Sequence, residues 1–228
     1  MKLTLVAKEP LVGDVVSFVF TTPEKLTWLP GQYMKYTLPH DNADDRGIER
    51  WFTIAAPPYE GKPRITTRIV GTENKMSTFK RALDGLEIGA TIEADAPEGD
   101  FVLADADENV FIAGGIGFTP FHAMLAELGH AGKMPKIKVL YGARDDEPAY
   151  HDELTALAAK YPQLELHYVI DPERVNEEVI RRFVSDVTKP HFYVSGPEPM
   201  VEAFEVMLKA MGITEAKLLN DYFPGYVW

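Results

Sequence analysis

The segment from Val110 to Leu125 has the most chemically informative residue spacing in the chain. An apolar run ends at Ala113, glycines follow at 114, 115 and 117, and Thr119-Pro120 stands where a helix would begin. Glycine permits conformations and close approaches that a Cβ would block, and Thr before Pro is typical of an N-cap and a first helical position. Unpaired N–H groups at such a helix start favour a pyrophosphate. The spacing predicts a phosphate-binding turn, although glycine-rich turns without a ligand share it.

Cysteine and histidine usage limits the chemistry of the chain. The 228 residues include no cysteine, which excludes disulfides, thiolate-held iron–sulfur clusters and a cysteine nucleophile. The six histidines show no metal-binding spacing, so no metal site is predicted. Redox chemistry would therefore need an organic cofactor or the metal centre of another protein.

The charge distribution bears on possible partners. A formal net charge of −12 argues against a nucleic-acid partner, because polyanions are bound through clustered Lys and Arg. Residues 62–81 are different, with six basic side chains against the single acid Glu73. This basic stretch is either a solvated face or an anion site, for a cofactor phosphate or an acidic partner protein.

Hydropathy bears on the location of the protein. A hydrophobic content of 46% is ample for packed cores, and no apolar run approaches the roughly 20 residues of a membrane span. The first ten residues lack the apolar core of a secretory signal. We therefore expect a globular protein in the cytoplasm, without a membrane span.

The second half of the chain alternates short apolar runs with helical stretches. The expected strands are Val110–Ala113, Ile137–Gly142, Leu164–Ile170, His191–Ser195 and Ala216–Leu219. The expected helices are Phe121–Gly129, Ala149–Tyr161, Asn176–Val184 and Pro199–Met211. This alternation predicts a parallel sheet wrapped by helices, whose ligands bind at the carboxyl ends of the strands. The glycine turn and Ser195-Gly196-Pro197 would meet at that edge.

The first half has a different pattern, with strand-like runs separated by Pro-Gly, Pro-Pro and Asp/Asn-rich turns. The expected strands are Val15–Thr21, Tyr33–Leu38, Trp51–Ala55, Arg64–Val70 and Thr91–Ala94. One helix is expected at Ser77–Asp84, with Ser77 as its cap. The pattern favours an antiparallel barrel or sandwich, and the acidic segment 104–109 is expected to connect the two halves.

Several short motifs carry a resemblance to a known family. They are Pro30-Gly-Gln-Tyr33, Arg50-Trp-Phe-Thr53, the Gly71 to Ser77 segment, Pro97-Glu-Gly-Asp-Phe101, Gly114-Gly-Ile-Gly-Phe-Thr-Pro120, Tyr141-Gly-Ala-Arg144 and Ser195-Gly-Pro197. In this order, over nearly the whole chain, they resemble the ferredoxin–NADP(+) reductase superfamily of flavoenzymes. The resemblance implies an FAD-binding antiparallel β-barrel at residues 1–105. It further implies a five-stranded parallel α/β domain for NAD(P) at residues 106–228, with an aromatic carboxy-terminal tail.

The resemblance also implies which residues hold the flavin. Arg50 would pair with a flavin phosphate, and Thr53 would hydrogen-bond near N5, the atom that receives hydride. Phe52 stands where the family usually has tyrosine, so it would pack without donating a hydrogen bond. The remaining expected flavin contacts are Trp51, Arg68, Met76, Ser77 and Thr78. Because the last four would serve a diphosphate, FAD is favoured over FMN.

For the nicotinamide cofactor, the resemblance implies a second set of residues. The pyrophosphate would be bracketed by Gly115, Ile116, Gly117 and Thr119. Beside the nicotinamide would lie Ser195, Gly196 and Pro197, with Ser195 at a position that holds cysteine in several relatives. Arg144 would pair with the 2′-phosphate of NADPH, whereas the acids at 145–147 would repel it. NADH and NADPH are therefore both expected as donors.

The tail 220–228 is rich in aromatic residues, and relatives often lay such a residue across the flavin ring. Phe223 and Tyr226 are favoured for this contact, and Thr53, Ser195, Phe223 and Tyr226 form the expected catalytic set. The alternative is that the tail packs on the barrel or on another subunit.

The implied activity is hydride transfer from NAD(P)H to FAD, followed by electron transfer to an external ferredoxin, flavodoxin or oxygenase component. A reductase of free flavin, quinone or ferric chelate is a second possibility. A flavin-bearing relay or regulatory subunit and a plain nucleotide-binding module are the others. The sequence leaves the acceptor, the direction of electron flow and the oligomeric state open.

Overall fold

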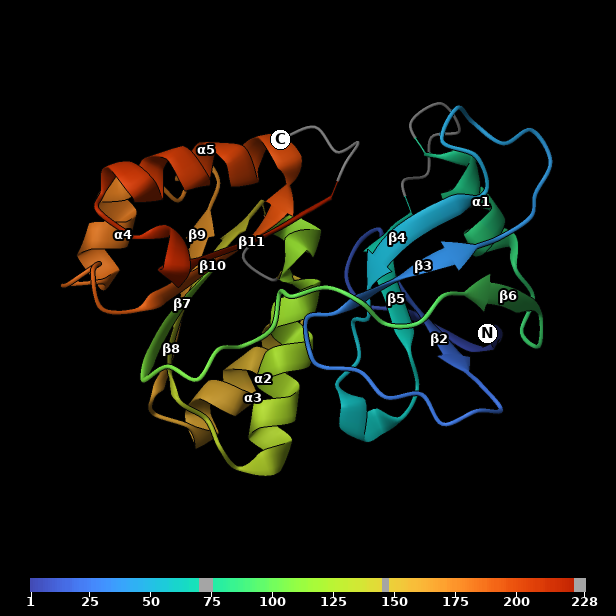
Figure 1. The fold of residues 1–228 in the computed structure, drawn as a ribbon, viewed down its shortest axis with the longest axis horizontal. Helices are drawn as coiled ribbons and strands as arrows, with labels where there is room; N and C mark the ends of the chain where they lie inside the picture. The colour runs from blue at the N-terminus through green and yellow to red at the C-terminus, as the bar shows by residue number, and fades with distance from the viewer. Residues whose placement is uncertain (70–75, 145–147, 224–228) are drawn as a thin grey trace. The chain divides into compact units, whose positions relative to one another are not determined.

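The computed structural model describes residues 1–69, 76–144 and 148–223. The chain forms two compact units (Figure 1), of which the first comprises Met1–Val102 with His122–Glu127 and the second comprises the remaining residues. The expected position of the domain boundary, between residues 105 and 106, stays a prediction.

The first unit is built on a six-stranded antiparallel sheet with the order β4-β3-β6-β1-β2-β5. Its strands are β1 (Lys2–Pro10), β2 (Val15–Thr21), β3 (Tyr33–Thr37), β4 (Glu49–Thr53), β5 (Arg64–Arg68) and β6 (Thr91–Ala94). The Ala55 N–H, just past β4, donates to the Arg64 carbonyl at the start of β5 at 2.9 Å. This bond joins the two edge strands, so the sheet curls toward a closed barrel as expected.

Strand β1 was not among the predicted strands. It pairs with β2 on one side and with β6 on the other, and a register shift lies between Leu5 and Ala7. Leu3 and Leu5 are completely buried, because alternate residues of a strand point to the core. With Phe18, Phe20 and Tyr36 they form the centre of the barrel core.

One helix, α1 (Thr78–Gly85), covers an end of this core, and η1 (Pro58–Glu60) is a short turn. Ser77 has extended backbone angles and its Oγ accepts a hydrogen bond from the Lys80 N–H at 3.3 Å. The prediction of Ser77 as the cap is confirmed. Helix α1 buries Phe79 and Leu83, which fixes its first turn against the barrel.

The second unit is a five-stranded parallel sheet with the order β11-β10-β7-β8-β9. The strands are β7 (Glu108–Gly114), β8 (Lys136–Ala143), β9 (Leu164–Ile170), β10 (His191–Pro197) and β11 (Leu218–Phe223). The connecting elements are η2 (Gly115–Phe118), α2 (Thr119–Ala131), α3 (His151–Lys160), α4 (Glu177–Phe183), α5 (Glu198–Ala210) and η3 (Glu215–Lys217). The expected connection over residues 104–109 ends at residue 107, because β7 begins at Glu108.

Helices pack on both faces of the parallel sheet. Helices α4 and α5 cover one face in Figure 1, where Ile112 and Val194 belong to a core with Phe204 of α5. On the other face Phe111 stacks on Phe121 at the start of α2, with ring centroids 4.5 Å apart. Strand order reverses between β7 and β10, so the ligand-binding switch point of such a sheet lies at the carboxyl ends of these two strands.

None of the helices in the described part of the chain has the length and apolarity that a membrane span requires.

Candidate functional site

The glycine turn lies at the switch point of the parallel sheet. Strand β7 ends at Gly114, and Gly115–Phe118 form the short helix η2, which leads directly into α2. An added Cβ on Gly117 would lie 2.4 Å from the Ser195 carbonyl oxygen and 2.7 Å from the Gly196 Cα. Real Cβ atoms do not come this close to backbone, so glycine is required at position 117. The structure thereby brings Gly115, Ile116 and Gly117 to the end of β10, as the sequence predicted.

The prediction that Thr119 is an N-cap is wrong. Its backbone angles are helical, and its N–H donates to the Ile116 carbonyl, because η2 has already formed the first turn. No side chain caps α2, and its first turn carries Pro120 as expected. The helical N–H groups therefore begin one turn earlier, at Gly115, and Thr119 is a buried residue of the first turn of α2.

A hydrogen-bonded Ser and Asp pair lies at the same edge. Ser195 is fully buried, and its Oγ donates to Asp221 Oδ2 at 3.1 Å. The parallel register of β10 and β11 places these two residues side by side. Burial raises the pKa of the Asp221 carboxyl to about 6, against the opposing effect of the hydrogen bond from Ser195.

Asp221 was missed by sequence reasoning, which ended the last strand at Leu219. The signal was present, since Asp221 comes two residues after that predicted strand, at the edge where ligands of parallel sheets bind. Strand β11 extends to Phe223 and so carries Asp221 into register with Ser195.

The remaining predicted residues of this unit are placed to different degrees. Gly196 and Pro197 end β10 and are in register with Tyr222 and Phe223 of β11. Arg144 follows β8 with an exposed side chain. The acids at 145–147 and Tyr226 lie outside the described residues, so the choice of nicotinamide cofactor and the flavin-stacking residue stay predictions.

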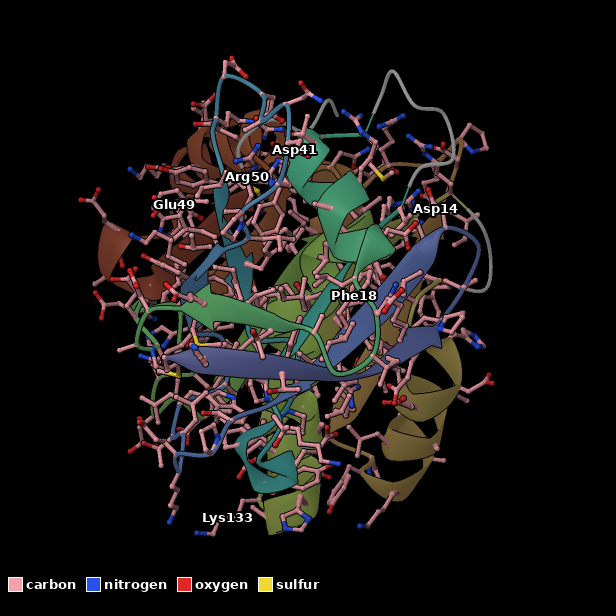
Figure 2. All side chains as sticks on the ribbon, turned by 90° about the vertical axis from the view of Figure 1, so that its right-hand side faces the viewer. Asp14, Phe18, Asp41, Glu49, Arg50 and Lys133 are labelled. Atoms are coloured by element: carbon pink, nitrogen blue, oxygen red, sulfur yellow. The ribbon has the colours of Figure 1, made fainter. Side chains whose placement is uncertain are left out.

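In the first unit, Arg50 of β4 is only 9% exposed and lies against α1, with its guanidinium carbon 5.6 Å from the centre of the Phe79 ring. Figure 2 shows it near the start of α1 and near the loop that carries Asp41. Its Nη2 donates to Asp44 Oδ1 at 2.5 Å. Its Nη1 donates to the carbonyls of Arg46, Gly47 and Glu49 at 2.9, 3.0 and 2.6 Å. Its Nε is buried and has no hydrogen-bond partner among the described residues.

Asp44 is the second residue that sequence reasoning missed. Its Oδ2 accepts a hydrogen bond from the Thr78 N–H at 3.2 Å, and its own N–H donates to Thr78 Oγ1 at 3.0 Å. Burial works against ionisation, but Arg50 and the N–H groups of Thr78 and Arg46 outweigh it and lower the pKa of Asp44 to about 2. No sequence signal marks Asp44, because its contacts depend on how a loop folds over α1.

Alternation along β4 separates the other flavin candidates. Phe52 lies on the same side as Arg50 and packs 6.0 Å from Tyr36 and 5.8 Å from Phe79, measured between ring centroids. Trp51 and Thr53 lie on the opposite side, with Trp51 55% exposed and Thr53 buried. The strand therefore presents the expected phosphate ligand and the expected N5 ligand on different faces.

The basic stretch is largely paired with acids or carbonyls. Arg64 Nη2 lies 2.9 Å from Glu60, and Arg68 Nη1 lies 3.4 Å from Asp14. Arg81 Nη1 donates to the Met76 carbonyl at 2.6 Å. Met76 and Ser77 thus lie at the start of α1 as expected, whereas Gly71 and Lys75 lie outside the described residues.

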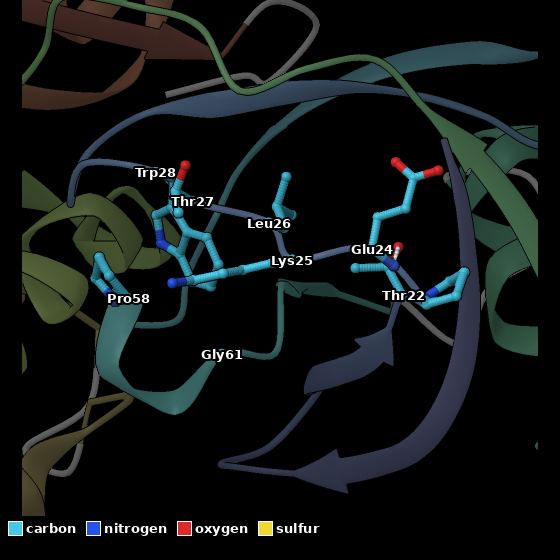
Figure 3. A pocket seen from close by; sticks show the side chains of 9 residues that line it. Thr22, Glu24, Lys25, Leu26, Thr27, Trp28, Pro58 and Gly61 are labelled. Carbon is cyan, nitrogen blue, oxygen red and sulfur yellow. Dashed lines mark hydrogen bonds between the residues drawn. The ribbon is translucent and has the colours of Figure 1, made fainter.

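A pocket lies elsewhere on the first unit, lined by residues 22–28 with Pro58 and Gly61 (Figure 3). None of the predicted site residues lines it.

Comparison with protein families assigns both halves of the chain. Residues 2–103 match the model of the oxidoreductase FAD-binding domain, and residues 111–205 match that of the oxidoreductase NAD-binding domain. Both matches agree with the resemblance to the ferredoxin–NADP(+) reductase superfamily. The chain therefore combines an FAD-binding domain with an NAD-binding domain, and the predicted fold class and cofactor classes are confirmed.

Individual relatives agree with this family. The flavohemoprotein of Pseudomonas putida is 28% identical over an alignment of 234 positions, which covers 96% of this chain and 58% of that protein. The reductase component of phenol 2-monooxygenase from a Pseudomonas strain is 30% identical over an alignment of 212 positions, which covers 85% of this chain and 57% of the relative. This chain thus spans under three fifths of the length of either relative.

A solved structure supports the same fold. Ferredoxin–NADP(+) reductase from Plasmodium falciparum superposes with a TM-score of 0.82 at 18% identity, covering 97% of this chain and 95% of that one.

Proposed function

We propose that this chain is an NAD(P)H-dependent flavoprotein reductase that delivers electrons to an external acceptor. The observation that carries the proposal is the succession of an FAD-binding and an NAD-binding domain of one reductase family in a single chain. When bound, FAD accepts a hydride and releases electrons one at a time, which links a two-electron donor to a one-electron acceptor.

The residues of the first unit fit a flavin diphosphate. Arg50 offers a buried Nε that is unpartnered among the described residues, and a guanidinium fork suits a phosphate. Thr78 is the first residue of α1, and the free N–H groups at the start of a helix also favour a phosphate. We assign diphosphate binding to Arg50 and to the start of α1, with Met76, Ser77 and Arg68 around it. Thr53 is assigned to the flavin ring.

The residues of the second unit fit a dinucleotide. The turn from Gly115 to Gly117 would hold the pyrophosphate, and Ser195 with Gly196 would form the wall beside the nicotinamide. Asp221 accepts the hydrogen bond of Ser195 and so fixes where its hydroxyl points. Neither residue is required to exchange a proton with substrate, because hydride transfer depends on the placement of the two rings.

An oxygenase component or a small electron-transfer protein is the proposed acceptor, by analogy with the phenol 2-monooxygenase reductase. The acid-paired arginines of the basic stretch give no specific support to an acidic carrier. A cytoplasmic location is proposed with it, and cell fractionation tests that location.

An anaerobic titration tests the function. Stepwise NADH, and in a second sample NADPH, should bleach the absorbance of the FAD-loaded protein with an end point near one donor per flavin. The donor that bleaches at the lower concentration is the preferred one. If neither donor changes the flavin spectrum, the proposed function is wrong.

A further inference from the structure

All the hydrogen-bond partners that the Arg50 side chain has among the described residues are held by its two Nη atoms. Its Nη1 serves three main-chain carbonyls, and its Nη2 serves Asp44 at 2.5 Å. Arginine binds phosphate most strongly through two parallel N–H groups on one edge of the guanidinium. On the edge formed by Nε and Nη2, Nε has no partner among the described residues, and Nη2 is the nitrogen that donates to Asp44.

Asp44 also binds a second group that could hold an anion, the N–H at the start of α1. Its other carboxylate oxygen accepts the N–H of Thr78, the first residue of α1. A carboxylate that joins an arginine to a helix start makes the contacts that a phosphate group would make. The carboxylate thus marks the position of an anion between β4 and α1.

We propose that Asp44 is an internal competitor for the FAD diphosphate, which has to displace its carboxylate from Arg50 and Thr78 in order to bind. This inference rests on the proposed function. A diphosphate held by Nε and the ionised Asp44 held by the neighbouring Nη2 would repel one another, so both cannot be bound there without loss. Asp44 therefore lowers the affinity for FAD and sets how readily the chain acquires and releases its cofactor.

A supporting role for Asp44 in FAD binding predicts the opposite change in affinity. If Asp44 only held Arg50 in a productive orientation, its removal would weaken FAD binding. The two roles differ in the sign of the change in affinity and are separated by one substitution.

The test uses the full-length apoprotein and Asp44→Asn, which removes the charge and keeps an oxygen that can accept from Thr78. The Kd for FAD is measured by quenching of flavin fluorescence. We expect tighter FAD binding on the order of tenfold, the equivalent of about 1.4 kcal/mol. Riboflavin, which has no phosphate, should bind with unchanged affinity.

Asp45→Asn is the matched control, because Asp45 is exposed, is the next residue of the loop and loses the same charge. Its FAD affinity should stay within about twofold of the parent. Circular dichroism checks folding, and Asp44→Ser replaces Asp44→Asn if the latter is unfolded, since serine also accepts hydrogen bonds at helix starts.

The outcomes are distinguishable. Unchanged or weaker FAD binding by Asp44→Asn, with FAD still bound by the parent, overturns the inference and leaves the proposed function standing. A gain shared equally by Asp45→Asn also overturns it, because a general charge effect would then explain the result. A folded parent that binds no FAD at all overturns both.

Discussion

At the scale of single residues, Asp221 shows how burial changes chemistry. The structure holds it beside the buried Ser195, and its pKa lies at about 6 instead of the usual 3.8. A raised pKa means that the folded chain binds this proton more tightly than the unfolded chain does. The stabilisation from protonation is therefore complete below pH 3.8 and is lost as the pH rises toward 6.

This sign gives a prediction for Asp221→Asn. In the parent, Asp221 lowers the free energy of unfolding as the pH rises from about 4 to about 6, roughly the interval between its two pKa values. In the variant this contribution is absent, so the free energy of unfolding should fall less over the same interval. Urea unfolding at several pH values measures it. Asp105→Asn, at an exposed aspartate, should follow the parent curve. A curve for Asp221→Asn parallel to that of the parent would contradict the raised pKa.

At the scale of elements, the approach of β7 and η2 to the end of β10 depends on one missing Cβ. Gly117→Ala would drive a methyl group into the backbone at Ser195 and Gly196, which cannot move without shifting β10. We expect a destabilisation of roughly 1–3 kcal/mol, as for other overpacked sites. We also expect weaker NAD(P)H binding, because the proposed pyrophosphate turn moves with it.

The matched control for this prediction is Gly85→Ala. A Cβ at Gly85 meets no heavy atom within 4 Å, and the residue ends α1, so the change should be neutral or slightly stabilising. Chemical denaturation and NADH titration measure both variants. Equal effects of the two substitutions would show that the close approach at Gly117 is not what requires glycine there.

At the scale of the whole molecule, the amino-acid composition limits where the electrons of a reduced flavin can go. The chain has no cysteine to hold an iron–sulfur cluster, so a reduced flavin would have to discharge to an added acceptor. NADH oxidation by the FAD-loaded chain under anaerobic conditions should stop near one equivalent per flavin and continue once ferricyanide is added. The absorbance of NADH follows both phases. Multiple turnovers without any acceptor would contradict this view.

Much of the fold followed from the sequence, for local reasons. Hydrophobic periodicity is a property of consecutive residues, so β9 and β6 were predicted with their observed bounds, and Ser77 was recognised as a cap from its own chemistry. Strand β1 was missed even though Leu3 and Leu5 alternate as expected, and its place between β2 and β6 could not be read from its own residues.

The sequence by itself determined the two-part architecture, the family resemblance, and the placement of Arg50, Gly117 and Ser195 in strands or in the turns that follow them. The tertiary structure alone decided what touches these residues. Asp44 meets Arg50 and Thr78 because a loop folds back on a helix 34 residues later in the chain. Asp221 meets Ser195 through the parallel register of two strands. A carboxylate acquires its partner and its pKa from neighbours in space, and spacing along the chain does not contain them.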